Sequence, residues 1–312
     1  METRHLGSTG LRVSLVGLGC NNFGGRLDLA GTRAVVHGAL DAGVTFFDTS
    51  DSYGNMGGSE TMLGETLGER RKDIVLATKF ASPMDKQKTY KDASRGYIMS
   101  AVEASLRRLR TDWIDLYQLH WPDPGTPIEE TLRALDDLVR SGKVRYIGCS
   151  NLAPWQIVDA VWTSRHLGLA SFASVQDEWS LLSRDTGAAL EPVADHYGLG
   201  FLPYYPLASG LLSGKYTRGQ ALPAGRLQTV KSWADRFLTE KNWSALEKLQ
   251  GFAESRGQSM AALAFGWLAA HRCVSSIIAG ATTAEQVTAN ARSATWKLTA
   301  DDLRAVDALL AA

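Results

Sequence analysis

The chain has 312 residues, 45% of them hydrophobic and 21% charged, and its 33 basic residues are balanced by 33 acidic ones. A net charge of zero excludes the strong electrostatic attraction typical of proteins that bind nucleic acid or an anionic membrane, so the expected partner is a small molecule. The length suits one barrel domain over residues 1–312, and the sequence leaves a homo-oligomer open.

The sequence shows no sign of export or of a membrane span. Residues 1–11 are too polar for a signal peptide, and the longest apolar segment, Met260–Ala270, is too short to cross a bilayer and is expected to be a core helix. Cys20, Cys149 and Cys273 lie far apart with no C-x-x-C pair, which favours buried thiols in a reducing compartment. We therefore expect a cytoplasmic protein without disulfides or a metal site.

Short apolar runs alternate with segments of helical periodicity along the chain. Ser94 and Pro127 are helix-start signals, and Ser141-Gly142 is a stop signal. The predicted strands are Val13–Leu18, Val44–Phe47, Ile74–Thr78, Ile114–Leu119, Tyr146–Ser150, Ser174–Glu178, Gly200–Tyr205 and Ser276–Ala279. Eight strands that alternate with helices predict an α/β fold, a closed parallel (β/α)8 TIM barrel, with a doubly wound open sheet as the alternative.

Two features extend this pattern. Arg4–Gly7 and Leu11–Val13 flank the turn residues Ser8-Thr9-Gly10, which predicts an N-terminal β-hairpin covering the floor of the barrel. The interval after the seventh strand exceeds one helix, so we expect an extended loop over Gly214–Glu240 and an extra helix over Trp243–Ser255.

Four polar residues follow three successive predicted strands. Asp48 and Lys79 each end a strand, Tyr53 lies five residues beyond Asp48, and His120 follows Leu119. Singly, each has an ordinary structural interpretation: an Asp caps a turn, a Lys is solvated, and a His packs through hydrogen bonds. Active sites of parallel barrels, however, lie at the carboxyl ends of the strands, where these four would meet.

Together the four side chains form a plausible proton-donor system. A tyrosine with a pKa of about 10 is a poor acid or base at neutral pH unless a neighbour stabilises its phenolate. The Lys79 ammonium can do so, and Asp48 can keep that lysine protonated despite burial. His120 can then hydrogen-bond a carbonyl oxygen.

These residues carry a resemblance to a known family. Phe47-Asp48-Thr49-Ser50-Asp51-Ser52-Tyr53-Gly54, Ala77-Thr78-Lys79 and Gln118-Leu119-His120 resemble the signature segments of the aldo-keto reductase superfamily, and similarity continues through 4–14, 142–151 and 280–286. In that family the matching residues are a catalytic tetrad in which the tyrosine, here Tyr53, donates the proton. The resemblance implies an NADP(H)-dependent oxidoreductase that reduces aldehydes or ketones, with no metal.

The segment after the eighth strand and Gly210-Leu211-Leu212-Ser213-Gly214-Lys215-Tyr216 also resemble those of the potassium-channel β subunits of the same superfamily. That likeness implies an alternative function, an NADPH-binding regulatory subunit with little turnover. A metal-dependent barrel hydrolase is disfavoured because the sequence has no H-x-H pair at a strand end.

Gly17-Leu18-Gly19 lacks the third glycine and the acidic residue of a Rossmann motif, so the sequence does not predict a Rossmann-type cofactor site.

The resemblance to the aldo-keto reductases implies where NADP(H) lies. In the family an extended cofactor crosses the barrel mouth, with the nicotinamide between polar strand ends and a stacked aromatic ring. The matching contacts here are Asn21, Asp48, Ser150, Asn151, Gln176, Tyr204, Tyr205, Pro206, Leu207, Ser209, Gly210, Leu211, Lys215, Arg226, Gly280, Thr282, Gln286 and Asn290.

Two positions depart from the family pattern. Ala281 stands where many members place Lys or Arg to bind the 2'-phosphate, and Ala289 replaces a carboxylate. The expected preference for NADPH therefore depends on Lys215, Arg226 and threonine hydroxyls.

An aromatic substrate pocket is expected beside the tetrad. Trp121 follows His120, and further aromatic residues are predicted in loops at the barrel mouth, which suits hydrophobic aldehydes or ketones. The predicted lining is Phe23, Tyr53, Phe80, His120, Trp121 and Trp233.

Overall fold

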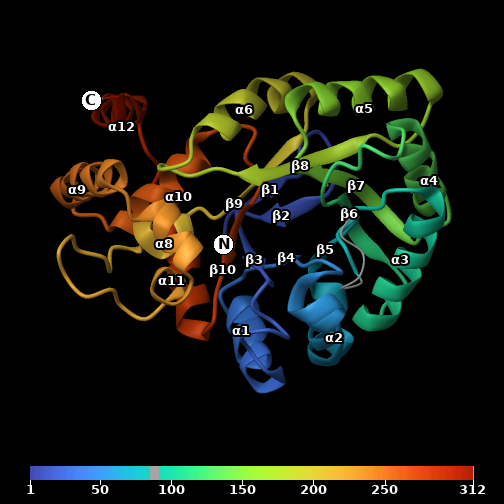
Figure 1. Ribbon diagram of the computed structural model, residues 1–312, viewed down its shortest axis with the longest axis horizontal. Helices are drawn as coiled ribbons and strands as arrows, with labels where there is room; N and C mark the ends of the chain where they lie inside the picture. The colour runs from blue at the N-terminus through green and yellow to red at the C-terminus, as the bar shows by residue number, and fades with distance from the viewer. Residues whose placement is uncertain (85–90, 312) are drawn as a thin grey trace.

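The computed structural model describes residues 1–84 and 91–311. Its central feature is a closed barrel of eight parallel strands in the order β10-β3-β4-β5-β6-β7-β8-β9, which confirms the predicted TIM barrel and rules out the open sheet (Figure 1). The barrel strands are β3 (Val16–Gly19), β4 (Phe46–Asp48), β5 (Val75–Phe80), β6 (Ile114–Leu119), β7 (Val144–Ser150), β8 (Phe172–Glu178), β9 (Gly200–Tyr204) and β10 (Ile277–Gly280).

Helices surround the strands, as Figure 1 shows. The helices that alternate with the strands are α1 (Leu29–Asp41), α2 (Tyr53–Leu67), α3 (Arg95–Leu109), α4 (Ile128–Arg140), α5 (Pro154–Leu167), α6 (Asp185–Tyr197), α10 (Met260–Ala270) and α11 (Ala284–Ser293). The Ser94 side chain accepts the backbone N–H of Tyr97 at the start of α3, and Pro127 directly precedes α4, so both predicted start signals are confirmed.

The remaining helical segments are η1 (Gly68–Asp73), η2 (Ala208–Ser213), α7 (Arg226–Thr229), α8 (Lys231–Phe237), α9 (Glu240–Ser255) and α12 (Ala300–Ala311). No helix in the described ranges is both long and apolar enough to cross a membrane. The expected core helix Met260–Ala270 is confirmed as α10, most of which is buried.

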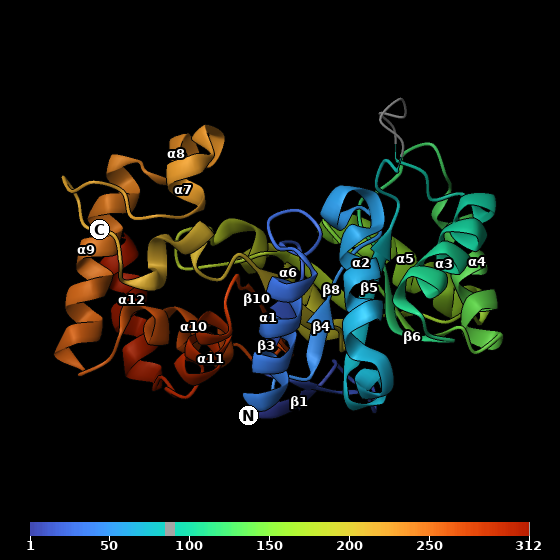
Figure 2. The same ribbon diagram turned by 90° about the horizontal axis from the view of Figure 1, so that it is seen from below.

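The predicted N-terminal hairpin is present as β1 (Thr3–His5) paired antiparallel with β2 (Arg12–Ser14). The prediction of one strand over Val13–Leu18 is wrong, because two strands share this segment: β2 of the hairpin ends at Ser14, and β3 of the barrel begins at Val16. The Ser14 hydroxyl donates to the carbonyl of Val16 at 2.7 Å and accepts the N–H groups of Thr45 and Phe46, which fixes this corner. Figure 2 shows β1 at the opposite end of the molecule from α7 and α8.

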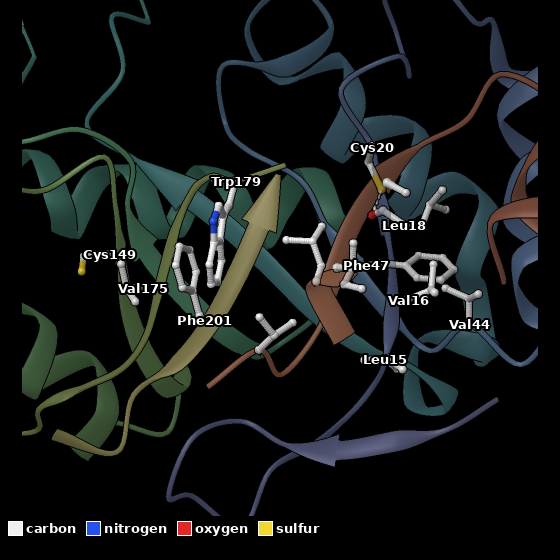
Figure 3. Packing of buried hydrophobic residues seen from close by; sticks show 14 of the residues in the cluster. Leu15, Val16, Leu18, Cys20, Val44, Phe47, Cys149, Val175, Trp179 and Phe201 are labelled. Carbon is white, nitrogen blue, oxygen red and sulfur yellow. Dashed lines mark hydrogen bonds between the residues drawn. The ribbon is translucent and has the colours of Figure 1, made fainter. Parts of the chain in front are cut away.

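Two apolar clusters fill the protein, as strand alternation requires. One lies inside the barrel, where Leu6 and Val13 of the hairpin region pack with Phe46 and Leu116, so the hairpin covers the barrel floor as predicted. The other lies between strands and helices and includes the neighbouring Phe47. Figure 3 shows part of this outer cluster.

Single residues explain further details of this packing. Trp179 stacks on Phe201 with ring centroids 5.0 Å apart (Figure 3). A Cβ at Gly17 would lie 2.9 Å from side-chain atoms of Phe46 and Ile278, so this glycine serves barrel packing, in line with our rejection of a Rossmann motif. All three cysteines are buried, as expected.

The long insertion after β9 differs from the prediction. The extra helix is confirmed as α9, but the expected extended loop over Gly214–Glu240 contains α7 and α8. Leu227 and Phe237 are almost completely buried, which explains why this polar segment folds back in short helices.

Candidate active site

The barrel register brings the four predicted catalytic residues to one end of the sheet. Asp48 pairs with Ala77 on β5, two residues before Lys79, and Lys79 in turn pairs with Gln118 on β6, two residues before His120. Parallel strands place such positions side by side, and alternation points them to the same face, the barrel interior.

A buried ion pair lies at the base of the site. Lys79 Nζ lies 2.6 Å from Asp48 Oδ2 and also donates to the carbonyl of Thr49 at 2.9 Å. The other carboxylate oxygen accepts amide N–H groups from Gln118 at 3.1 Å and Gln176 at 2.9 Å. Burial alone would lower the pKa of Lys79, but Asp48 and Tyr53 outweigh it and raise the pKa, so the lysine stays charged as expected.

Tyr53 lies directly over this pair, with Lys79 Nζ 5.0 Å from its ring centroid. Burial raises the pKa of Tyr53 above its ordinary value, and the Lys79 charge opposes this rise without cancelling it. Lys79 therefore favours the Tyr53 phenolate as expected, but the pKa of Tyr53 is raised overall. The phenol is therefore protonated at neutral pH and available as a proton donor.

The turn that carries Tyr53 has an unusual backbone. Gly54, Asn55, Met56 and Gly57 all have positive φ, so α2 becomes regular only beyond them. A Cβ at Gly54 would lie 2.3 Å from the carbonyl oxygen of Phe23, so only glycine fits after the tyrosine.

His120 completes the group from β6. Its ring meets the Tyr53 ring edge-to-face with centroids 5.7 Å apart. Its Nδ1 lies 3.1 Å from Ser50 Oγ and 2.9 Å from Ser82 Oγ. Burial, followed by the charges of Lys79 and Lys91, lowers the pKa of His120 well below its ordinary value, so the imidazole is neutral.

The residues expected around the nicotinamide form a connected polar set at the ends of β7, β8 and β9. Asn151 donates to Ser150 Oγ and to the His120 carbonyl, both at 2.9 Å, and Tyr204 OH donates to Asn151 Oδ1 at 2.8 Å. Gln176 differs from the expectation in one respect, because its amide N–H is already bonded to Asp48.

The segment after β9 has a strained backbone, with positive φ at Tyr205, Ala208 and Ser209. Such strain is concentrated at functional sites. The Ser209 hydroxyl oxygen is buried and has no hydrogen-bond partner within 1–84 and 91–311. Next to this segment, Lys215 is exposed and donates to the Ala224 carbonyl at 3.0 Å, and the Arg226 guanidinium lies 5.7 Å from the Tyr205 ring.

The predicted adenosine residues gather after β10. Thr282 donates its N–H and hydroxyl to Gln286 Oε1 at 2.8 and 3.1 Å, and Asn290 lies one turn further along α11. A Cβ at Gly280 would lie 3.5 Å from Asn21 Oδ1, which places Asn21 beside this loop.

Three of the predicted site residues lie deep in the protein. Phe23, Phe80 and Leu211 have no exposed surface, and their side chains pack in the outer core cluster. Phe80 follows Lys79 on β5, so alternation turns its ring away from the barrel mouth and onto Tyr117, 4.8 Å away between centroids.

The other aromatic residues remain candidates for a pocket. Trp121 is 36% exposed and stacks near the His120 ring, while Trp233 of α8 is partly buried with its ring 5.0 Å from that of Tyr205. Pro206, Leu207 and Gly210 lie within the strained segment after β9.

Sequence reasoning missed several residues that support the site. Gln118 donates a hydrogen bond to Asp48. Ser50 and Ser82 lie against Nδ1 of His120. Asn22 donates to the Ala281 carbonyl at 3.1 Å, and its own Oδ1 is buried without a partner in the described ranges. A signal existed for Gln118, which lies two positions before His120 and so faces the same side of its strand.

Comparison with known proteins agrees with this architecture. The sequence profile of the Aldo/keto reductase family matches residues 15–311, so the chain belongs to that family and is an oxidoreductase of its type.

Curated relatives span nearly the whole chain. It is 38% identical to the uncharacterized oxidoreductase YrpG of Bacillus subtilis (92% of this chain, 89% of the relative) and 36% identical to a probable voltage-gated potassium channel subunit beta of Oryza sativa (94% and 91%). It is 33% identical to L-glyceraldehyde 3-phosphate reductase of Escherichia coli (94% and 87%).

Proposed function

We propose that this protein is an NADP(H)-dependent reductase of aldehydes or ketones in which Tyr53 donates the proton. The observation that carries the proposal is the buried Lys79–Asp48 pair directly below a protonated Tyr53, with a neutral His120 beside it. This is the arrangement that a carbonyl reduction needs, because charge develops on the carbonyl oxygen as the hydride arrives.

Each side chain has a distinct task in this mechanism. Tyr53 and His120 hold the carbonyl oxygen between them by hydrogen bonds. As negative charge builds on that oxygen, Tyr53 transfers its phenolic proton to it, and the Lys79 ammonium stabilises the phenolate left behind. Asp48 keeps Lys79 charged and fixed throughout, since its two oxygens hold the lysine, Gln118 and Gln176.

The residues at the barrel mouth fit NADP(H), which supplies the hydride when bound. Asn151, Ser150 and the side-chain carbonyl of Gln176 would hold the carboxamide, and the Tyr204 ring would lie against the nicotinamide. The buried Ser209 hydroxyl without a partner and the strained backbone around it suit a pyrophosphate. The other predicted contacts, Asn21, Lys215, Arg226, Gln286 and Asn290 among them, would bind the adenosine end and its 2'-phosphate.

The aromatic mouth favours substrates with a hydrophobic body. Trp121 and Trp233 flank the site, and Tyr205 lies between the tetrad and α8. The relative named L-glyceraldehyde 3-phosphate reductase makes a phosphorylated aldehyde a second class worth testing.

The test is a spectrophotometric assay of NADPH oxidation with aromatic, aliphatic, dicarbonyl and phosphorylated carbonyl compounds, with NADH in parallel. Tyr53→Phe should bind NADPH almost as tightly as the wild type but react about 10²–10⁴-fold more slowly, since it loses a group used mainly in the transition state. Full activity in this variant would rule out the assigned role of Tyr53.

The same assay addresses a regulatory function, which the potassium-channel relatives suggest. Tight NADPH binding without turnover of any carbonyl would replace the reductase proposal with that of a cofactor-binding subunit.

A further inference from the structure

A second group of buried polar side chains lies behind His120, on the side of its Nδ1. Ser50 Oγ lies 3.1 Å from that nitrogen and 3.1 Å from Asp51 Oδ1, so it connects the imidazole to a carboxyl group. Asp51 is only 1% exposed, and the proposed mechanism gives it no task. Because Nδ1 faces Ser50 and Ser82, Nε2 is the ring nitrogen left to face a substrate.

The surroundings of Asp51 disfavour its charge. Among charged groups, Glu60 of α2 has the strongest effect on Asp51, and Glu60 is itself paired with Arg108 of α3 at 2.7 Å. Tyr97 of α3 donates to Asp51 Oδ2 at 3.4 Å, and the Tyr117 ring of β6 lies in the same buried layer. Burial and then Glu60 raise the pKa of Asp51 to about 7, against smaller opposing effects of Ser50 and Arg108.

We propose that Asp51 is a positioning residue that determines, through the Ser50 hydroxyl, which ring nitrogen of His120 carries the proton. The inference rests on the proposed reductase function, in which His120 contacts the substrate oxygen.

Two proton arrangements connect Asp51 to His120 through Ser50, and they differ by one proton. When Asp51 is neutral, its O–H donates to Ser50 Oγ, the Ser50 O–H donates to Nδ1, and Nε2 carries the imidazole proton. When Asp51 is ionised, the Ser50 O–H donates to the carboxylate, Nδ1–H donates to Ser50 Oγ, and Nε2 has a free lone pair. The change from the first to the second releases one proton to solvent. Ser82 Oγ accepts the same Nδ1–H in the second arrangement, and in the first the hydroxyls of Ser50 and Ser82 share the one lone pair of Nδ1.

The two arrangements differ in how well they support the proposed reaction. A protonated Nε2 can donate to the substrate oxygen and stabilise the negative charge that develops on it. An unprotonated Nε2 cannot, and because the reverse oxidation passes through the same transition state, with Tyr53 accepting the alcohol proton, both directions should slow as Asp51 ionises. Asp51 would therefore make the reaction rate fall as the pH rises through neutrality, while Lys79 and Lys91, whose charges lower the pKa of His120, keep the imidazole itself uncharged.

The proposal is tested by NMR on the full-length protein labelled with 15N-histidine, without cofactor or substrate. Protonated and unprotonated ring nitrogens resonate far apart, so the spectrum reports the tautomer directly. We expect the His120 proton on Nε2 at about pH 5.5 and on Nδ1 at about pH 8.5, with a midpoint near the pKa of Asp51.

Variants test whether Asp51, acting through Ser50, causes the change of the His120 tautomer. Asp51→Asn should keep the proton on Nε2 at both pH values, because an amide N–H donates to Ser50 permanently as the neutral acid does. Ser50→Ala should abolish the coupling by removing the connecting hydroxyl. The matched control is Asp177→Asn, since burial also raises the pKa of Asp177, to about 6, but this residue has no contact with His120 and its replacement should leave the midpoint unchanged.

A wild-type tautomer that is the same at both pH values, or a change that persists in Asp51→Asn, would overturn the proposal. If one variant does not fold, the wild-type titration and the other variant still decide it. The NMR readout is independent of turnover. A pH-dependent tautomer change in a protein that reduces no carbonyl would support the inference about Asp51 and refute the reductase proposal. Carbonyl reduction by a protein whose His120 tautomer does not change would refute the inference and leave the reductase proposal standing.

Discussion

The raised pKa of Asp51 makes a quantitative prediction about stability. In the unfolded chain this carboxyl ionises at its ordinary pKa of 3.8, and in the folded protein at about 7. The folded-state value is the higher one, so the stabilising contribution is complete below about pH 4 and is lost as the pH rises to about 7. At 1.36 kcal/mol for each unit of pKa difference, the whole effect is about 4 kcal/mol, of which about 2.5 kcal/mol falls between pH 5 and pH 8.

Asp51→Asn should remove this loss. Because asparagine does not ionise, the free energy of unfolding of the variant relative to wild type should increase by about 2.5 kcal/mol between pH 5 and pH 8. Urea unfolding followed by tryptophan fluorescence at both pH values measures this difference, with the exposed Asp112→Asn as a control for the substitution itself. A difference that does not change with pH would show that Asp51 ionises as it does in water and would refute the account of its burial.

Three further predictions concern the ion pair, the packing and the cofactor. Asp48→Asn leaves Lys79 without its charged partner in a buried position and should lower the free energy of unfolding by about 3–5 kcal/mol, measured by urea unfolding at pH 7; a loss near zero would contradict the ion-pair argument. Gly64→Ala would place a Cβ 2.3 Å from the Arg108 carbonyl oxygen and should lower the free energy of unfolding by about 1–3 kcal/mol. Gly251→Ala in α9, where a Cβ would meet nothing within 4 Å, should raise it by about 0.5–1 kcal/mol. Equal melting temperatures for these two variants would show that α2 and α3 separate easily. Lys215→Met should raise the Kd for NADPH about tenfold and leave that for NADH unchanged, as loss of one contact to the 2'-phosphate requires; equal effects on the two cofactors, measured by fluorescence titration, would move the phosphate site elsewhere.

Much of the fold could be predicted because its signals are local. Alternation of apolar runs with helical periodicity gave the eight strands, and Ser94 and Pro127 marked helix starts through their own capping chemistry. The two failures depend on contacts that sequence pattern does not contain. The break at Ser14 exists because its hydroxyl bonds to Val16 and to the next strand, and α8 forms because Phe237 finds a place in the core.

In the candidate site, too, some residues could be predicted from local sequence signals and others depend on tertiary packing. Asp48, Lys79 and His120 could be placed together because parallel strand ends meet, and Tyr53 because it follows Asp48 closely. Phe80 is predicted to lie in a loop at the barrel mouth, but it is the last residue of β5, and because one step along a strand reverses the face, its ring packs on Tyr117. Asp51 could not be foreseen as a perturbed group, because its raised pKa depends on Glu60 and on the depth of burial, which only the packing of α2 and α3 determines.

The alternation of the barrel strands also explains how a charged pair can lie in the protein interior. Phe46, Ala77 and Leu116 form an apolar layer above the hairpin, and two residues further along the same strands come Asp48, Lys79 and Gln118. The polar layer thus rests on a dry one, which strengthens its electrostatic interactions and makes any unpaired group costly. Asp48 of β4 therefore finds its partner Lys79 on the neighbouring strand β5. Burial keeps His120 neutral and holds the pKa of Asp51 near 7, whereas Lys79 stays charged because Asp48 and Tyr53 outweigh the effect of burial, so the protonation states of the site depend on which buried groups have a charged partner.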